Sequence, residues 1–548
     1  MLLHLPAGNE QLLRVAETLM VMNEHSPQRP ISLPRRGLVF VGGFAISLLL
    51  YLATLAKGVV WGDSAKLTLY AIEASPQWGS VGGHPLHTLA GMGVLALLPQ
   101  ADPAWLINAL SAGMAAFAVG LAGLISLELS DRREAPWIAI VALSASHTFW
   151  SLAVVAESYS MAIAAGGLIL FLLLRSRRYG PAKAITNQLL AGVLTGLSTG
   201  INALTILAMP GFLHLLVESS GPSRLRLSIQ RLIFFSSGVL IGLIGLKLLA
   251  ALVSGAALTQ AGAWEAVDDA AGEYLRGFDL RKLVMFVPNA IYQFPWLVLV
   301  GAWGLLVCIQ GRQWPWAALP SWLATRSWSE WSLLIAAASV FLFASTYQYQ
   351  RHFVFLAYPF FFLAILLGVW LAPSLARINR TSLRAFPLLL IPLINIPVYA
   401  GLHRLPGVSR AVNYRDLPGR GSAYFFEPWK HTLNPSAETW GNAWIAGLPP
   451  KAVVLADFTP ARVLSYCRLR QQRSDVTILE TDRFLMTAQG YEPEGFLRLL
   501  DQQLATGRPV FLGDRHPQYY FLAELQRRYR LEPYGSGFRV VAKALAPR

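Results

Sequence analysis

Residues 37–64 read GLVFVGGFAISLLLYLATLAKGVVWGDS, a long apolar run that ends at a single acidic residue, Asp63. The apolar part supplies the roughly 20 residues that a transmembrane helix needs. The polar leader before it, residues 1–36, is too long for a secretory signal peptide. The stretch therefore predicts an uncleaved signal anchor, and it places a carboxylate where the chain leaves the membrane.

The composition extends this interpretation to the whole chain. Of its 548 residues, 54% are hydrophobic and 14% are charged, whereas soluble domains carry about a quarter charged residues. Together with the first run, further apolar runs predict about eleven membrane crossings. The later runs lie near 104–126, 136–150, 160–174, 188–201, 203–217, 232–254, 288–309, 331–346, 353–371 and 386–402.

The distribution of lysine and arginine predicts the orientation. Basic clusters such as Arg35–Arg36 and RSRRYGPAK fall on one side of the expected spans, and the positive-inside rule makes that side cytoplasmic. Asp63 then faces the opposite side, in a long first external loop. The expected external loops are 57–103, 147–160, 198–203, 255–287 and 345–352.

After residue 402 charged residues return, and the short runs AVVLAD, VTILE and PVFLG alternate with helix-like stretches near 460–472, 493–506 and 518–530. This alternation is typical of a small α/β domain. We therefore expect a polytopic α-helical membrane protein with a C-terminal extracytoplasmic α/β domain. The expected division is a cytoplasmic segment 1–36, a transmembrane catalytic domain 37–402 and the α/β domain 403–548.

Several classes of function are excluded or disfavoured. The net charge of +15 fits cytoplasmic loops and anionic lipid better than nucleic acid, because the basic residues are dispersed and no recognition motif accompanies them. The two cysteines, Cys308 and Cys467, suggest neither a disulfide framework nor a metal cluster. No glycine-rich nucleotide motif is present. Gly238 and Gly242 form a small-x-x-x-small pair, which predicts close helix packing.

The outward loops collect the ionisable residues that are hard to explain as lipid-facing structure, among them Asp63 and Glu157. Such groups are costly near membrane depth unless they face a cavity or a partner. Each has a simpler alternative: Asp63 can cap the following helix, and Glu157 can pair with an arginine or bond backbone amides. His84 and His87 stand three apart and can face one metal ion, although no acidic or cysteine ligands accompany them.

Arg351 and His352, in YQYQRHF, follow the same logic. They are either interfacial anchors or cations that bind an anionic substrate group.

Taken together, four motifs resemble a known family. WGDS after the first span, PLHTLAG, NALSA and above all SHTFWSLAVVAESYSMAI at 146–163 look like the membrane glycosyltransferase family that includes protein O-mannosyltransferases, a branch of the GT-C superfamily. GLSTGINALTILAMPG is similar to a further family segment, with Asn202 at its asparagine. The resemblance is strong over about 38–205 and patchy beyond. Ser80 and Ala203 stand where the family motifs have histidine.

The resemblance implies transfer of a hexose from a polyprenyl-phosphate donor to an acceptor hydroxyl at the outer face. Mannose is the first candidate for the hexose, and a protein is the first candidate for the acceptor. Asp63 would act as general base and Glu157 would orient it or hold substrate. The donor phosphate is expected at Arg351, with His352, Arg276 and Lys282 behind it. Sugar or acceptor contacts are expected at Trp61, Ser64, His84, His87, Tyr159, Asn202 and Trp264. No metal ligands or cofactor are predicted, and a divalent metal requirement stays open.

Three alternatives remain. The same fold can transfer sugar to a lipid or glycan, or the chain can be a non-enzymatic flippase for lipid-linked sugar. In the third, Asp457 and Asp514, at the ends of expected strands, make the C-terminal domain the catalyst. The compact loops favour a bacterial inner membrane.

Overall fold

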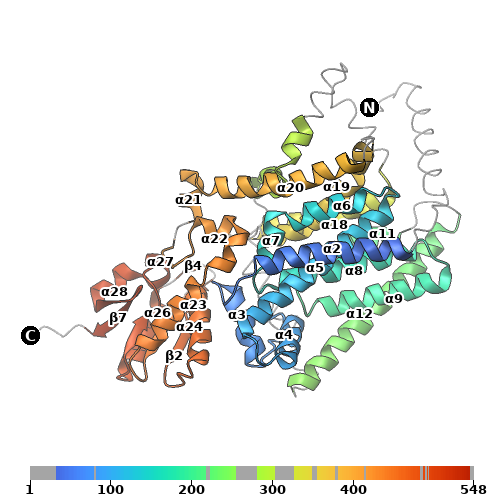
Figure 1. Ribbon diagram of the computed structural model, residues 1–548. Helices are drawn as coiled ribbons and strands as arrows, with labels where there is room; N and C mark the ends of the chain where they lie inside the picture. The colour runs from blue at the N-terminus through green and yellow to red at the C-terminus, as the bar shows by residue number, and fades with distance from the viewer. Residues whose placement is uncertain are drawn as a thin grey trace, which may run out of the picture.

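The computed structural model shows a helical body with an α/β unit at one end (Figure 1). The fold is described for residues 33–78, 82–217, 222–254, 280–302, 326–347, 354–376, 381–412, 415–481, 486–487, 490–491 and 493–542.

The body is built from long helices joined by shorter ones. They are α2 (Leu33–Ala53), α3 (Asp63–Ile72), α4 (Pro85–Leu97), α5 (Pro103–Leu129), α6 (Ala135–Ser144), α7 (His147–Ala153), α8 (Ser158–Ser176), α9 (Pro181–Ser198), α10 (Leu204–Leu207), α11 (Met209–Leu216), α12 (Arg224–Ser254), α14 (Leu280–Val284), α15 (Phe286–Gln293), α18 (Trp328–Thr346), α19 (Ala357–Ala376) and α20 (Thr381–Leu402).

Six helices among the described residues are long and apolar enough to cross a membrane. They begin at Pro34, Pro103, Ser158, Arg224, Trp328 and Val354. Shorter apolar helices occupy Pro85–Leu97, Ala135–Ser144 and Leu388–Leu402. The polytopic character predicted from composition is therefore confirmed, whereas the number eleven stays a prediction.

Several expected segments differ in detail. The span expected at 136–150 is divided into α6 and α7 at Ala145–Ser146, and the span expected at 203–217 is divided into α10 and α11. The external loop 57–103 folds into α3 and α4. Their starts agree with local chemistry, because a glycine precedes Asp63 and a proline stands at the first position of α4.

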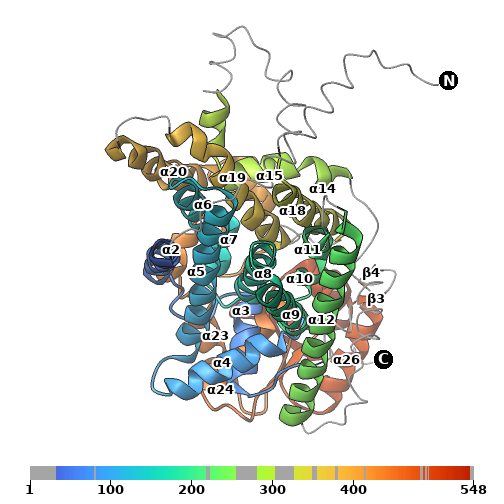
Figure 2. The same cartoon turned by 90° about the vertical axis from the view of Figure 1, so that its right-hand side faces the viewer.

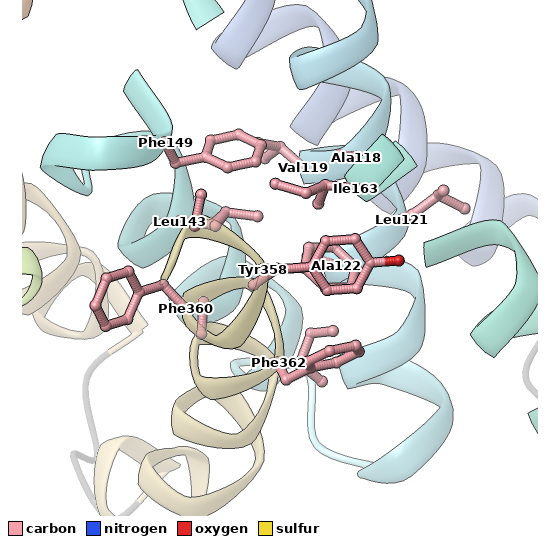
Figure 3. Close-up of a cluster of buried hydrophobic side chains, with 14 of the residues drawn as sticks. Ala118, Val119, Leu121, Ala122, Leu143, Phe149, Ile163, Tyr358, Phe360 and Phe362 are labelled. Carbon is pink, nitrogen blue, oxygen red and sulfur yellow. The ribbon is translucent and has the colours of Figure 1, made fainter. Parts of the chain in front are cut away.

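Helix α5 is the centre of the body. It packs against α2, α6, α8 and α19, and Figure 2 shows it between α2 and α8. Its buried face is rich in alanine and glycine, so neighbouring helices approach closely. Figure 3 shows this core, in which Val119 and Ala122 of α5 meet Ile163 of α8 and the aromatic rings Tyr358 and Phe362 of α19.

The two ends of the body carry different charges. At one end, Glu128 of α5 accepts ion pairs from Arg36 at 2.9 Å and from Arg178 at 2.6 Å. These arginines belong to two clusters expected on one side of the membrane, so the structure agrees with that grouping. At the other end of α5 lies Asn108. Twenty residues separate Asn108 from Glu128, and at the helical rise this is about 30 Å, the thickness of a hydrocarbon core.

The C-terminal part forms an α/β unit. It contains α21 (Pro406–Val412), α22 (Ser422–Phe426), η4 (Pro428–Leu433), α23 (Ser436–Gly447), β1 (Val453–Ala456), α24 (Phe458–Arg470), β2 (Thr477–Glu480), β3 (Met486–Thr487), β4 (Gly490–Tyr491), α26 (Pro493–Ala505), β5 (Val510–Leu512), α27 (Pro517–Tyr520), α28 (Leu522–Arg528), β6 (Tyr529–Tyr534) and β7 (Gly537–Ala542). The main sheet has the order β2-β1-β5-β7-β6.

The three short runs expected as strands form β2, β1 and β5, which pair in parallel. The stretch expected as one helix at 518–530 is instead interrupted at Phe521, whose φ is 47°. It then enters the antiparallel hairpin β6–β7, which the sequence did not predict. The extracytoplasmic location and the boundary at residue 403 stay predictions.

Helices α9 and α12 pack along each other over an extended contact. A Cβ atom added at Gly238 would lie 2.3 Å from the carbonyl oxygen of Leu189, and one at Gly242 would lie 2.3 Å from that of Val193. Both distances are far below van der Waals contact. The helix-packing role expected for this glycine pair is therefore confirmed.

We expect Gly242→Ala to separate α9 from α12, because its new methyl group meets a backbone carbonyl that cannot move independently. Overpacking of this kind costs about 1–3 kcal/mol. The thermal unfolding midpoint of the protein in detergent should fall.

Gly245→Ala is the matched control, since no atom lies within 4 Å of a Cβ at that position. It should leave the midpoint unchanged or raise it through the better helix propensity of alanine. Equal effects of the two substitutions would contradict the packing role.

Candidate active site

The Asp63 loop ends in a tight helix start. Gly62 has a φ of 89°, which a residue with a side chain rarely adopts, and it is the N-cap residue of α3. Asp63 is the first residue of the helix, and its Oδ1 lies 2.6 Å from Lys66 Nζ, one turn later. Gly62, and not Asp63, therefore occupies the N-cap position of α3. The Asp63 carboxylate forms an ion pair with Lys66.

Lys66 is a site residue that the sequence reasoning missed. Its side chain is 10% exposed, against 31% for Asp63, and its Nζ also donates to the Gly82 carbonyl at 3.2 Å. Burial opposes the charged ammonium, but attraction to Asp63, and more weakly to Glu157, outweighs it and raises the pKa of Lys66. The structure therefore pairs Asp63 with a buried cation, and Glu157 lies within the electrostatic reach of that cation. The i, i+3 spacing of Asp63 and Lys66 on an expected helix was the available signal.

Glu157 occupies the N-cap position of α8 and is half-buried. Its backbone is held by Ser111 of α5: the Glu157 N–H donates to Ser111 Oγ at 3.0 Å, and that hydroxyl donates back to the Glu157 carbonyl at 3.1 Å. A residue outside regular structure thus has both backbone groups satisfied. Ser111 therefore fixes the backbone from which the Glu157 side chain extends.

Asn108, one turn before Ser111, links both carboxylate segments. Its Nδ2 donates to the carbonyls of Ala56 at 2.9 Å and Gly58 at 3.1 Å, and its Oδ1 accepts from the Ala156 N–H at 2.7 Å. The asparagine and serine of the NALSA motif therefore support the loop before Asp63 and the residue before Glu157.

The turn after α9 closes another side of this region. His84 Nδ1 donates to the Ile201 carbonyl at 2.7 Å, and Asn202 Nδ2 donates to the Ser158 hydroxyl at 3.2 Å. Burial, and next the nearby Lys66 charge, lower the pKa of His84 to about 4. His84 is thus neutral at physiological pH, and Asn202 contacts the residue after Glu157.

The first residues of α3, α4 and α8 all lie at this end of the body, and Figure 1 shows α3 between the long helices and the α/β unit. Helix N-termini carry a partial positive charge. Together with Lys66, they make the surroundings of the two carboxylates suitable for an anionic group.

The remaining predicted site residues are placed as follows. Ser64 is buried, with its hydroxyl 3.5 Å from the Val60 amide, and His87 is buried in α4. Tyr159 packs edge-on against Phe355. Lys282 of α14 donates to the Tyr347 carbonyl. Arg351, His352, Arg276 and Trp264 lie outside the described residues.

The position of Trp61 does not fit the sugar-stacking role expected for its ring. Its side chain is buried between the loop and the α/β unit, with its ring centroid 5.0 Å from that of Trp440. It offers no open face to a ligand.

Asp457 and Asp514, proposed as a second catalytic centre, are both ion-paired with Arg415. The three side chains are buried. Burial opposes ionisation of Asp514 more strongly than Arg415 favours it, which raises the pKa of the Asp514 carboxyl. Arg415 belongs to the connecting segment between α21 and α22. Its side chain therefore occupies the position that a substrate would need.

Comparisons with known proteins bear on the fold and on the family that the chain resembles. The family model described as protein O-mannosyl-transferase TMEM260 N-terminal domain matches residues 77–222. The crystal structure of ArnT from Cupriavidus metallidurans in the apo state has 12% identity and a TM-score of 0.50, with 93% of this chain and 99% of that chain covered. Residues 77–222 therefore resemble a protein O-mannosyltransferase domain, and the chain as a whole has the fold of ArnT.

A second ArnT structure from the same organism, bound to undecaprenyl phosphate, has 13% identity and a TM-score of 0.51. It covers 94% of this chain and 100% of that chain. The search of curated proteins found no match to this chain. The matched segment 77–222 contains Asn108, Ser111, Glu157 and Asn202, so much of the supporting structure around the carboxylates lies within it.

We expect Ser111→Ala to destabilise the segment around Glu157, because the Glu157 N–H loses its acceptor. A buried donor left unpaired costs about 1–3 kcal/mol. The unfolding midpoint in detergent should fall, and amide exchange at residues 154–158 should rise.

Ser126→Ala on the same helix is the control. Ser126 is buried too, but within the described part of the chain its hydroxyl has no hydrogen-bond partner. If both alanine variants behave alike, Ser111 does not hold the Glu157 backbone.

The buried neutral state of His84 predicts a pH dependence of stability. Because its folded pKa of about 4 lies below the ordinary 6.5, its contribution is present above pH 6.5. It is lost as pH falls toward 4, and the shift corresponds to about 3 kcal/mol. Thermal unfolding between pH 7.5 and 4 measures this loss.

His84→Asn tests the assignment, since asparagine tolerates the left-handed backbone at this position and its amide can donate to Ile201. The variant should lose less stability than the wild type over the same pH interval. Parallel curves for the two proteins would show that His84 is not the titrating group.

Proposed function

We propose that the enzyme transfers a hexose from a polyprenyl-phosphate donor to a hydroxyl group on an acceptor protein. Mannose is the first candidate for this hexose. The transfer would occur at the Asp63 end of the body, on the extracytoplasmic face. The observation that carries this proposal is the ion pair between Asp63 and Lys66, with Glu157 in the electrostatic reach of that lysine. A proton acceptor and a cation at one place are what the displacement of a phosphate by an alcohol requires.

In the proposed step the acceptor oxygen attacks the anomeric carbon while the bond from that carbon to the phosphate oxygen breaks. The hydroxyl proton passes to the Asp63 carboxylate, and the bonding electron pair leaves with the lipid phosphate. General-base assistance of this kind is worth about 10²- to 10⁴-fold. A single displacement inverts the anomeric centre.

Lys66 would stabilise the charge that develops on the departing phosphate. An ammonium group has three N–H donors, so it can bind a phosphate oxygen while it keeps its contacts with Asp63 and Gly82. The N-terminal ends of α3, α4 and α8 would add to this positive potential. We keep Arg351, with His352, Arg276 and Lys282, as further candidates for the phosphate.

Glu157 would bind sugar hydroxyls or orient the acceptor, because its backbone is fixed while its side chain lies in the electrostatic reach of Lys66. Asn202, Tyr159, His84 and His87 surround the same region and remain candidates for sugar or acceptor contacts.

The donor, sugar and acceptor rest on different support. A neighbour of the same fold was crystallised with undecaprenyl phosphate, which supports a polyprenyl-phosphate donor. The name of the matching family supports mannose and a protein acceptor. Transfer to a lipid or glycan uses the same site and differs only in which hydroxyl enters it.

We expect Asp63→Asn and Lys66→Gln to reduce turnover for different reasons. In proteoliposomes supplied with polyprenyl-phosphate hexose and an acceptor, Asp63→Asn removes the base and should lower kcat by at least about 100-fold. Lys66→Gln removes the cation and should lower kcat by about 10²- to 10³-fold. Release of labelled sugar from the donor is the readout, and Glu157→Gln belongs in the same series.

Glu73→Gln is the control, because Glu73 is exposed at the other end of α3. Full turnover in a folded Asp63→Asn protein would remove Asp63 as the base. Movement of intact donor across the bilayer by the wild type, without bond cleavage, would instead identify a transporter.

A further inference from the structure

The α/β unit grips the loop that leads into Asp63. Trp61 Nε1 donates to the Pro418 carbonyl at 3.1 Å, and the Tyr424 hydroxyl donates to the Trp61 carbonyl at 3.3 Å. The Trp61 ring packs against Trp440 of α23. We call these four residues, Trp61, Pro418, Tyr424 and Trp440, the Trp61 clamp. Trp61 stands two residues before Asp63, so the clamp holds the backbone next to the proposed base.

A second contact lies two residues further from Asp63. The Val59 N–H donates to the carboxylate of Glu438 in α23 at 3.2 Å. Burial, and next the nearby Asp102, raise the pKa of Glu438. On the membrane side, Asn108 binds the carbonyl of Gly58. The loop is therefore held from the body on one side and from the α/β unit on the other.

The clamp is itself fixed to the sheet of the α/β unit. Arg415, three residues before Pro418, pairs with Asp457 and Asp514 at the carboxyl ends of the neighbouring parallel strands β1 and β5. This is where α/β sheets usually bind ligands. Here a buried arginine occupies it, and its charge-assisted hydrogen bonds attach the connecting segment to the sheet.

Helix α3 is supported along its side as well. It packs against α24. Lys66 Nζ lies 5.5 Å from the ring centre of Phe458, the first residue of α24, and the Arg462 guanidinium lies 5.8 Å from the Tyr70 ring. The α/β unit thus contacts Asp63's loop, its helix and its cationic partner.

We propose that the α/β unit is a positioning element that holds Asp63 in place for catalysis through the Trp61 clamp. Trp61, Tyr424 and Trp440 are positioning residues, since they act on the substrate through Asp63. The catalytic meaning of the clamp rests on the proposed function, whereas its mechanical effect on the loop does not. The C-terminal unit would therefore be required for transfer although it contributes no reacting group.

The test uses two conservative substitutions in the full-length protein. Trp61→Phe keeps an aromatic ring against Trp440 and removes the donor to Pro418, and Tyr424→Phe removes the donor to Trp61. Tyr529→Phe is the control. The hydroxyl of Tyr529, on strand β6, donates to Asp501 on helix α26, and both elements belong to the same α/β unit. Each single variant loses one hydrogen bond. Tyr424→Phe loses only the hydroxyl oxygen, whereas Trp61→Phe also makes a buried ring smaller.

Hydrogen–deuterium exchange of residues 57–67 is the first readout. The double variant Trp61→Phe/Tyr424→Phe should raise exchange in this segment about tenfold, while the control leaves it unchanged. The second readout is transfer: kcat should fall about 10- to 100-fold with the KM for the lipid donor unchanged, because a misplaced base slows the chemical step. The unfolding midpoint of Tyr424→Phe alone should match that of the control.

The outcomes separate the two proposals. Unchanged exchange at 57–67 in the double variant overturns the clamp, whatever the enzyme does. Faster exchange with full kcat also overturns it as a positioning element. If exchange is faster in the double variant but the wild type transfers no sugar, the clamp still holds the loop mechanically. The proposed function is then wrong.

Discussion

The side-chain amide of Asn108 is the interaction on which the site depends. It satisfies carbonyls of Ala56 and Gly58 and the amide of Ala156, three backbone groups outside regular structure near the membrane surface. Such groups cost several kcal/mol each when they are buried without a partner. One residue on the central helix α5 therefore permits two chain breaks side by side, and each break presents a carboxylate.

The charges at the two ends of the body are arranged for different purposes. At one end, two arginines pair with the buried Glu128, and these ion pairs join α2, α5 and the end of α8. At the other end, Lys66 pairs with Asp63, and Asp63 keeps nearly a third of its side-chain surface exposed. The first cluster is a closed structural pair. The second remains accessible to a substrate, as a reactive carboxylate must be.

The sequence was informative where local chemistry decides structure. Apolar length predicted the long helices, and short β-branched runs predicted β1, β2 and β5. The hairpin β6–β7 was missed because YRLEPY and GFRVVA carry charged residues that look helical or solvent-exposed in isolation. Lys66 was missed because a lysine near an aspartate is usually a surface pair. Trp61 was interpreted as a sugar-binding ring because burial against Trp440, nearly 400 residues away, leaves no local signal.

Motif spacing alone indicated that Asp63 and Glu157 are special, because carboxylates at membrane depth are expensive and persist only with a purpose. It also indicated the fold, since the long apolar runs and the pattern around Glu157 together resemble few other proteins. Only the packed structure decided that Asp63 pairs with Lys66, that Arg415 occupies the end of the sheet, and that the C-terminal unit holds the Asp63 loop. Those facts depend on contacts between distant segments, and such contacts are set by burial and hydrogen-bond satisfaction across the whole chain rather than by any stretch of it.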